Sequence, residues 1–261
     1  MTTSIRLELE ETHRAPLVAE DAYCLYGWLM EQLPPAYAAY LHEEGERPFC
    51  QYLLPSREGR HRAVYQWTLF SEDAVQMVAP ILLNSTSLRF RSGGKQVCVR
   101  RAEKETFRFE EAVERCFTAP VLPSSYQLRF LSPTTFKTEN QYALFPTAGL
   151  VVKSAASRFA LLDSGVTLQD EEALRQLVES ARIIGYSLHT QRYSMKGAVI
   201  PGFTGWVRRA IHGPTAMKRL FWLLMCALPH TSVGIKTALG MGGCTVEESF
   251  PKTEEVFSWN R

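Results

Sequence analysis

The part of this chain best suited to bind phosphate is a glycine-rich stretch near the C-terminus, VGIKTALGMGG at residues 233–243. Glycine has no Cβ atom, so its backbone can approach a bulky ligand and present N–H groups to it. The spacing fits neither the P-loop nor the dinucleotide-binding fingerprint. The alternative is a structural loop whose glycines serve only turns. The candidate phosphate contacts are Gly234, Lys236, Thr237, Gly240, Gly242 and Gly243.

The charges around this stretch indicate the same kind of ligand. Residues 190–243 contain seven basic residues and no Asp or Glu, with aromatic residues among them. An acid-free basic segment with interleaved aromatic rings is typical of a site for a polyanion such as nucleic acid. The net charge of the chain is only +2, because its N-terminal part is rich in acids. The alternative is a solvated basic face with core aromatics. The basic residues outside the glycine-rich stretch are Arg192, Lys196, Arg208, Arg209, Lys218 and Arg219.

The rest of the composition excludes several classes of protein. The six cysteines are scattered without a CxxC pair, and there is no HExxH motif. We therefore predict free thiols in a reducing compartment, and neither a tightly bound metal nor another cofactor. The N-terminus lacks the apolar core of a signal peptide, and no apolar run approaches the roughly 18 residues of a membrane span. We expect a cytoplasmic protein that does not bind membranes.

Two successive units of strands and helices must position the candidate residues. The first, residues 1–120, is predicted to run β-α-β-β-α-β, and two prolines within 119–123 indicate a linker. The second unit, residues 121–261, repeats a similar order. We predict an α+β protein of two tandem ferredoxin-like (RRM-like) domains with antiparallel sheets.

Several helix boundaries follow from single residues. Ser71 and the acids after it predict the start of a helix, and Pro34-Pro35 should interrupt the helix before it. In the second unit an apolar helix is predicted to begin with Pro214 at its first position and to end before Pro229. The glycine-rich stretch then follows this helix and precedes the final strand.

Three segments together resemble a known family. They are FLSPTTF at 130–136, the pair YSMKG and PGFTGWV within 193–207, and the glycine-rich GIKTALGMGG. They look like the motifs of CRISPR repeat-processing endoribonucleases of the repeat-associated RNA-binding (RAMP) superfamily. The resemblance is strongest over residues 126–250 and implies two RRM-like domains that bind CRISPR repeat RNA.

The resemblance also implies a reaction. The 2′-hydroxyl upstream of the cut attacks the adjacent phosphorus without a metal ion, leaving a 2′,3′-cyclic phosphate and a 5′-hydroxyl. A base, an acid and a cation that stabilises the phosphorane are required. Histidine suits the proton transfers because it ordinarily titrates near neutrality.

The segment LHEEGERPF at 41–49 resembles the part of the family that carries the catalytic histidine. His42 is therefore implied as general base or acid, and Tyr37 and Tyr40 as residues that orient the hydroxyl. Arg47 stands where some relatives have a lysine, which implies a role in stabilising the phosphorane. Arginine stays protonated and cannot act as a general acid.

Two other functions remain open at this stage. The absent lysine and the acids beside His42 are compatible with a noncatalytic subunit that holds repeat RNA in a CRISPR effector complex. A more distant reading is a general RRM-type RNA binder. The partners we expect are therefore repeat RNA and, in the second reading, other effector subunits, and a homodimer is left undecided.

Overall fold

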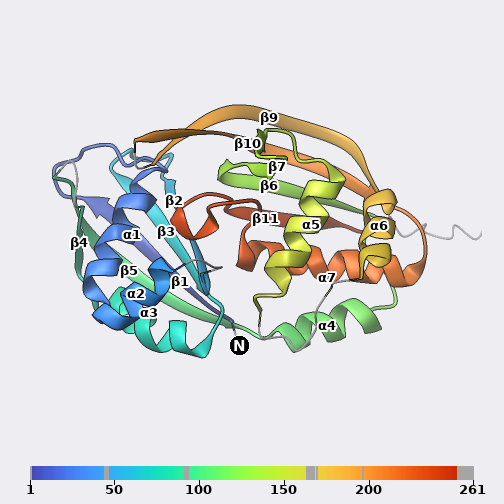
Figure 1. Ribbon diagram of the computed structural model, residues 1–261, viewed down its shortest axis with the longest axis horizontal. Coiled ribbons are helices and arrows are strands. Elements are labelled where there is room, and N and C mark those ends of the chain that lie inside the picture. The colour runs from blue at the N-terminus through green and yellow to red at the C-terminus, as the bar shows by residue number, and fades with distance from the viewer. Residues whose placement is uncertain are drawn as a thin grey trace, which may run out of the picture.

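The computed structural model describes residues 2–43, 47–90, 94–162, 168, 170–195 and 197–251. The chain forms two larger antiparallel sheets, each packed against helices, with the N-terminal sheet running from blue to green and the C-terminal sheet from green to red (Figure 1). No helix within the described residues is long and apolar enough to span a bilayer.

The N-terminal sheet has the strand order β2-β3-β1-β5-β4. Alternation along β1 turns Ile5, Leu7 and Leu9 into a core that also contains Leu25 and Leu29 of α1. The strands are β1 (Thr2–Glu11), β2 (Phe49–Pro55), β3 (Arg62–Leu69), β4 (Ser87–Arg89) and β5 (Gln96–Phe107). The helices are α1 (Asp21–Gln32), α2 (Pro35–His42) and α3 (Glu72–Asn84).

The C-terminal sheet has the order β11-β6-β10-β9, and a separate hairpin joins β7 to β8. In each larger sheet, counting only that sheet's strands in chain order, the first strand lies between the third and the last, which is the ferredoxin-like arrangement. The strands are β6 (Ser125–Thr134), β7 (Phe136–Thr138), β8 (Gln141–Ala143), β9 (Ala181–Met195), β10 (Ala198–Ile211) and β11 (Cys244–Ser249). The helices are α4 (Phe109–Thr118), α5 (Ala148–Phe159), α6 (Glu171–Ser180), α7 (Thr215–Thr231) and the 3₁₀ turn η1 (Thr237–Leu239).

Contacts cross between the two units in both directions. Helix α4 follows β5 in the chain, yet its Phe109 and Cys116 pack in the same core cluster as α5 and α7. In the other direction, Ala238 of η1 packs into the N-terminal core. The Nε2 of the buried Gln51 on β2 donates to the Ala238 carbonyl over 3.2 Å. The glycine-rich stretch is therefore anchored on the opposite unit, and a division of the chain near residue 120 stays a proposal.

The predicted fold class of two tandem ferredoxin-like domains is confirmed, and the helix boundaries need one correction. Ser71 Oγ accepts a hydrogen bond from the Ala74 N–H at 3.2 Å, capping α3 as predicted. Helix α7, however, continues through Pro229 to Thr231, and Pro214 occupies its N-cap position. Pro229 has no backbone N–H, so the helix lacks one of its hydrogen bonds there. The last turn persists because the Ser232 N–H donates to Leu228 at 2.9 Å and Arg158 Nε donates to Thr231 at 3.1 Å.

Candidate functional site

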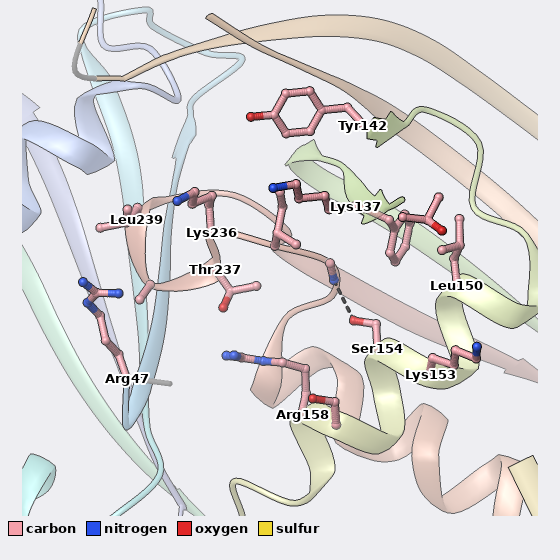
Figure 2. Close-up of a pocket in the computed structure, with 16 residues that line it drawn as sticks. Arg47, Lys137, Tyr142, Leu150, Lys153, Ser154, Arg158, Lys236, Thr237 and Leu239 are labelled. Atoms are coloured by element: carbon pink, nitrogen blue, oxygen red, sulfur yellow. Dashed lines mark hydrogen bonds between the residues drawn. The ribbon is translucent and has the colours of Figure 1, made fainter. Parts of the chain in front are cut away.

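A cavity of about 730 Å³ lies where the two units meet. One wall comes from Arg47, just before β2, and the others come from the β7–β8 hairpin, α5 and the glycine-rich stretch (Figure 2). Residues far apart in the sequence are thus brought to one site. The C-terminal part of the lining includes Lys137, Tyr142, Lys153, Ser154, Arg158, Gly234, Lys236 and Thr237.

The lining of the cavity is strongly positive. It contains five basic side chains and, among the described residues, no Asp or Glu. Because like charges converge without a counter-ion from the lining, the cavity favours an anionic ligand. These basic residues, called the cavity cations below, are Arg47, Lys137, Lys153, Arg158 and Lys236.

Helix α5 supplies several lining residues from one of its faces. Lys153, Ser154, Ser157 and Arg158 follow the three- and four-residue spacing of a helical face. The other face carries apolar residues such as Val152 and Phe159, which are buried in the C-terminal core. Thr147 caps the N-terminus of the helix, because its Oγ1 accepts from the Leu150 N–H at 3.3 Å. Packing of the apolar face therefore aims the polar face at the cavity.

Backbone geometry fixes the start of the glycine-rich stretch. Gly234 has φ +84°, and a Cβ atom there would meet the Thr135 carbonyl oxygen at 2.4 Å. The residue must be glycine for both reasons. Its N–H donates to Ser154 Oγ at 2.8 Å, the dashed line in Figure 2. Two residues later Lys236 adopts a left-handed conformation, with φ 59°, and its side chain is exposed at the cavity.

The two arginines of the lining, Arg47 at the left and Arg158 at the lower centre of Figure 2, have different surroundings. Arg158 is 8% exposed, donates from Nε to the Thr231 carbonyl and stacks its guanidinium over the Phe70 ring at 5.6 Å. Arg47 has a buried Nε without a hydrogen-bond partner among the described residues. A buried donor without a partner is costly, and an anion in the cavity would satisfy it.

The predicted catalytic residues lie on or just after α2. Tyr37 is half-buried, and burial raises the pKa of its phenol to about 12. Tyr40 is 59% exposed, and the two rings are 5.9 Å apart. His42 is exposed in the last turn of the helix and, unlike Arg47, is not part of the cavity lining as described. It lies five residues before Arg47, so a chain advancing at most about 3.6 Å per residue keeps their Cα atoms within about 18 Å.

The other predicted residues of the glycine-rich stretch divide into two groups. Gly234, Lys236 and Thr237 line the cavity. Gly240, Gly242 and Gly243 are buried. A Cβ atom at Gly243 would meet the Tyr52 ring at 2.5 Å, so this glycine permits close packing against β2. For this second group the structural alternative holds, because these glycines serve turns and close packing.

The basic residues of β9, β10 and α7 do not line the cavity. Arg192 and Arg208 are exposed on the C-terminal sheet, and Arg208 donates to Gln127 Oε1 at 2.7 Å. Lys218 lies half-buried on α7. Arg219 donates to the carbonyls of Cys116 and Ala119, at 2.7 and 3.0 Å, and so ties α7 to the end of α4. Lys196, also predicted to contact RNA, lies outside the described residues.

Arg209 requires a correction. It is 3% exposed and donates a hydrogen bond to the Pro146 carbonyl, and burial lowers the pKa of its guanidinium to about 10. Arg208 and Arg209 are adjacent on a strand, so their side chains leave opposite faces of the sheet. Only one of the two can therefore face solvent, and we no longer assign Arg209 to a phosphate contact.

Three cavity cations, Lys137, Lys153 and Arg158, were missed from the sequence. They lie outside the acid-free segment that drew attention to residues 190–243. One signal was present, because Lys153, Ser154 and Arg158 share a helical face. Nothing in the sequence pattern placed Lys137 near them.

Comparisons with known proteins agree with this fold. The family model of "CRISPR-associated endoribonuclease Cas6" matches residues 128–244. A Cas6 endoribonuclease of Streptococcus thermophilus is 27% identical over 231 residues, which are 88% of this chain and 93% of the relative. A Cas6 endoribonuclease of Mycobacterium tuberculosis is 27% identical over 261 residues, 97% of this chain and 80% of the relative.

A solved structure of a Cas6 protein is also similar to this chain. Thermus thermophilus Cas6 is similar with a TM-score of 0.72 and 25% identity, over 95% of this chain and 98% of that one. The resemblance to CRISPR repeat-processing endoribonucleases that the three sequence motifs predicted is thereby confirmed.

Proposed function

We propose that this chain is a Cas6-type endoribonuclease, which binds the repeat RNA of a CRISPR transcript and cuts it to release guide RNA. One observation carries the proposal. In a chain that resembles Cas6 endoribonucleases over 97% of its length, five cations and a glycine-rich stretch line one cavity between two ferredoxin-like units. A convergent set of cations suits several consecutive phosphates better than a single small anion.

We propose a transesterification that requires no metal ion. The 2′-hydroxyl loses its proton to a base and attacks phosphorus, and the 5′ oxygen leaves with a proton from an acid. The products are a 2′,3′-cyclic phosphate and a 5′-hydroxyl. The electrostatic part of catalysis is stabilisation of the phosphorane, for which a fixed cation is sufficient.

Named residues fit these roles. Arg47 supplies the fixed cation, because its Nε is buried in the cavity wall without a partner among the described residues. His42, at the end of α2 and five residues before Arg47, acts as the general base or the general acid. Tyr37, whose phenol burial keeps protonated by raising its pKa to about 12, is assigned to orienting the 2′-hydroxyl. Tyr40 is assigned only to orienting the substrate.

A noncatalytic subunit of an effector complex is the second candidate. The observation that favours it is the position of His42, which does not line the cavity as described and is followed by Glu43. Such a protein would bind the same repeat RNA through the cavity cations and leave it uncut.

The experiment compares three RNAs of equal length in EDTA: the cognate repeat, a scrambled repeat, and the repeat with a 2′-deoxy nucleotide at the mapped cut. The proposal expects one discrete cut in the first RNA only, and tight binding of the first and third. Tight binding without a cut would support the noncatalytic subunit. Equal binding of repeat and scrambled RNA would reduce the function to general RNA binding.

A further inference from the structure

The β7–β8 hairpin is a small separate element at the rim of the cavity. Its two strands pair with each other and with neither of the larger sheets. The turn residues Glu139 and Asn140 have φ 48° and 62°, the left-handed pair that joins hairpin strands tightly. Thr135 Oγ1 donates to the Ala143 carbonyl at 3.4 Å and closes the base of the hairpin. The hairpin is therefore a defined projection.

Strand register gives the hairpin two different faces. Phe136 pairs with Ala143, and both pack against the C-terminal core. Lys137 pairs with Tyr142 at the next position, so these two side chains share the opposite face. Both line the cavity, and Figure 2 shows them extending over it on the side of Lys236. Packing of one face thus presents a cation and an aromatic ring to the cavity together.

The ring of Tyr142 is accessible to a ligand in the cavity. Its side chain is 44% exposed although it stands beside a cavity rich in cations. An aromatic ring next to a positively charged groove is the usual platform for a nucleobase, because every base has a π-face that can stack on it. A protein partner fits less well, since the cavity lining brings five cations and, among the described residues, no carboxylate.

We propose that the hairpin is a nucleotide-binding subsite, in which an unpaired base of the RNA stacks on Tyr142 while Lys137 contacts its phosphate. The inference rests on the proposed function, and it adds a stacked nucleotide to the RNA path. Stacking selects for an unpaired base but reads little sequence. The subsite therefore positions a single-stranded nucleotide next to the cavity cations, whichever base it carries.

The test uses the full chain and repeat RNA carrying 2-aminopurine at one unpaired position at a time. Tyr142→Ala is expected to weaken binding by about 10-fold, the loss of one stacked base, and to abolish the fluorescence quenching at one position. Tyr142→Phe should keep the wild-type affinity and the fluorescence quenching, because the ring is retained. Lys137→Ala should lower the slope of log Kd against log salt by about one, whereas Tyr142→Ala should leave the slope unchanged. The matched control is Tyr186→Ala on β9, a 59% exposed tyrosine outside the cavity lining.

The outcomes separate the two proposals. If the wild type binds and cuts repeat RNA but Tyr142→Ala behaves like Tyr186→Ala, the hairpin subsite is wrong and the proposed function stands. If the wild type neither binds nor cuts repeat RNA, the proposed function fails and the subsite with it. A loss in Tyr142→Ala that Tyr142→Phe does not rescue would show that the hydroxyl acts instead of the ring, which also contradicts stacking.

Discussion

The backbone N–H of Gly234 donates to Ser154 Oγ over 2.8 Å and joins the glycine-rich stretch to α5. Both partners line the cavity, and α5 also supplies Lys153 and Arg158 to it. This hydrogen bond contributes to the position of Lys236 relative to two other cavity cations, together with the Ile235 N–H, which donates to the Thr135 carbonyl at 3.1 Å. The bond thus connects two walls of the cavity that are far apart in the sequence.

Ser154→Ala tests the link. Removing the hydroxyl leaves a half-buried N–H without its acceptor, so we expect a loss of about 1 kcal/mol in the free energy of unfolding. RNA binding should weaken by no more than a few-fold, because Lys236 loses one of several contacts that place it and the Ile235 N–H still donates to the Thr135 carbonyl at 3.1 Å. Urea unfolding and a binding titration measure the two effects. Ser157→Ala, on the same helical face but exposed, should leave stability unchanged. Equal stability of the two variants would show that the link contributes nothing.

Gly243→Ala tests the packing of the stretch against the N-terminal unit. The added methyl would lie 2.5 Å from the ring of Tyr52, which is only 7% exposed and has little room to move. Overpacking of this kind costs about 1–3 kcal/mol, and we expect a loss of stability in that range. Gly27→Ala is the control, since it lies inside α1 with no atom within 4 Å of the new methyl. It should be neutral or slightly stabilising. A neutral Gly243→Ala would contradict the close contact.

Part of this architecture could be predicted from the sequence, because it depends on local rules. Ser71 as a helix cap and Pro34-Pro35 as a break between helices needed no knowledge of the rest of the chain. Pro229 failed as a stop signal because its cost is offset by a contact from Arg158, which lies on a different helix. Local patterns carry no information about such a partner.

The candidate site also depends on contacts between distant residues, which local sequence patterns do not reveal. The glycine-rich stretch was found by composition, but Lys137 reaches the cavity only through hairpin register and the packing of Phe136. Arg209 was predicted to contact phosphate but is buried, and alternation along the strand already indicated that Arg208 and Arg209 lie on opposite faces of the sheet. The roles of His42, Tyr37 and Tyr40 came from the family resemblance and remain predictions.

Arg47 should be important for rate more than for binding. If its guanidinium stabilises the phosphorane, Arg47→Ala should slow single-turnover cleavage by about 100-fold or more, with a much smaller change in Kd for RNA. Arg47→Lys keeps the charge and should recover a large part of the rate. Equal losses of binding in the lysine and alanine variants, with an unchanged cleavage step, would assign Arg47 to RNA binding alone.

His42→Ala should remove the general base or general acid of the reaction. We expect cleavage to slow by about 100- to 10,000-fold, while RNA binding stays close to the wild type. His189→Ala is the matched control, an exposed histidine on β9 that lies outside the cavity lining. If cleavage survives in His42→Ala and is lost in His189→Ala, the catalytic centre lies elsewhere.

His230 should make stability depend on pH. Its ring stacks on Phe107 at 4.0 Å, and burial lowers its pKa to about 4, below the usual value of 6.5. Between these values the unfolded chain binds more protons than the folded chain, so stability falls as the pH drops from about 6.5 to about 4. The loss attributable to this residue is on the order of 2 kcal/mol. Urea unfolding across this range should show a shallower pH dependence in His230→Gln. The control is the exposed His212→Gln, and a shared slope in both variants would contradict the assignment.

The most direct test of the central claim is the chemistry of the RNA ends after incubation of the wild-type protein with its repeat RNA in EDTA. We predict one cut that leaves a 2′,3′-cyclic phosphate and a 5′-hydroxyl, both readable by mass spectrometry of the fragments. A 5′-phosphate product, or cleavage that appears only when a divalent metal is added, would contradict the proposed reaction. Repeat RNA that is tightly bound and recovered intact would contradict the claim that the protein is an enzyme.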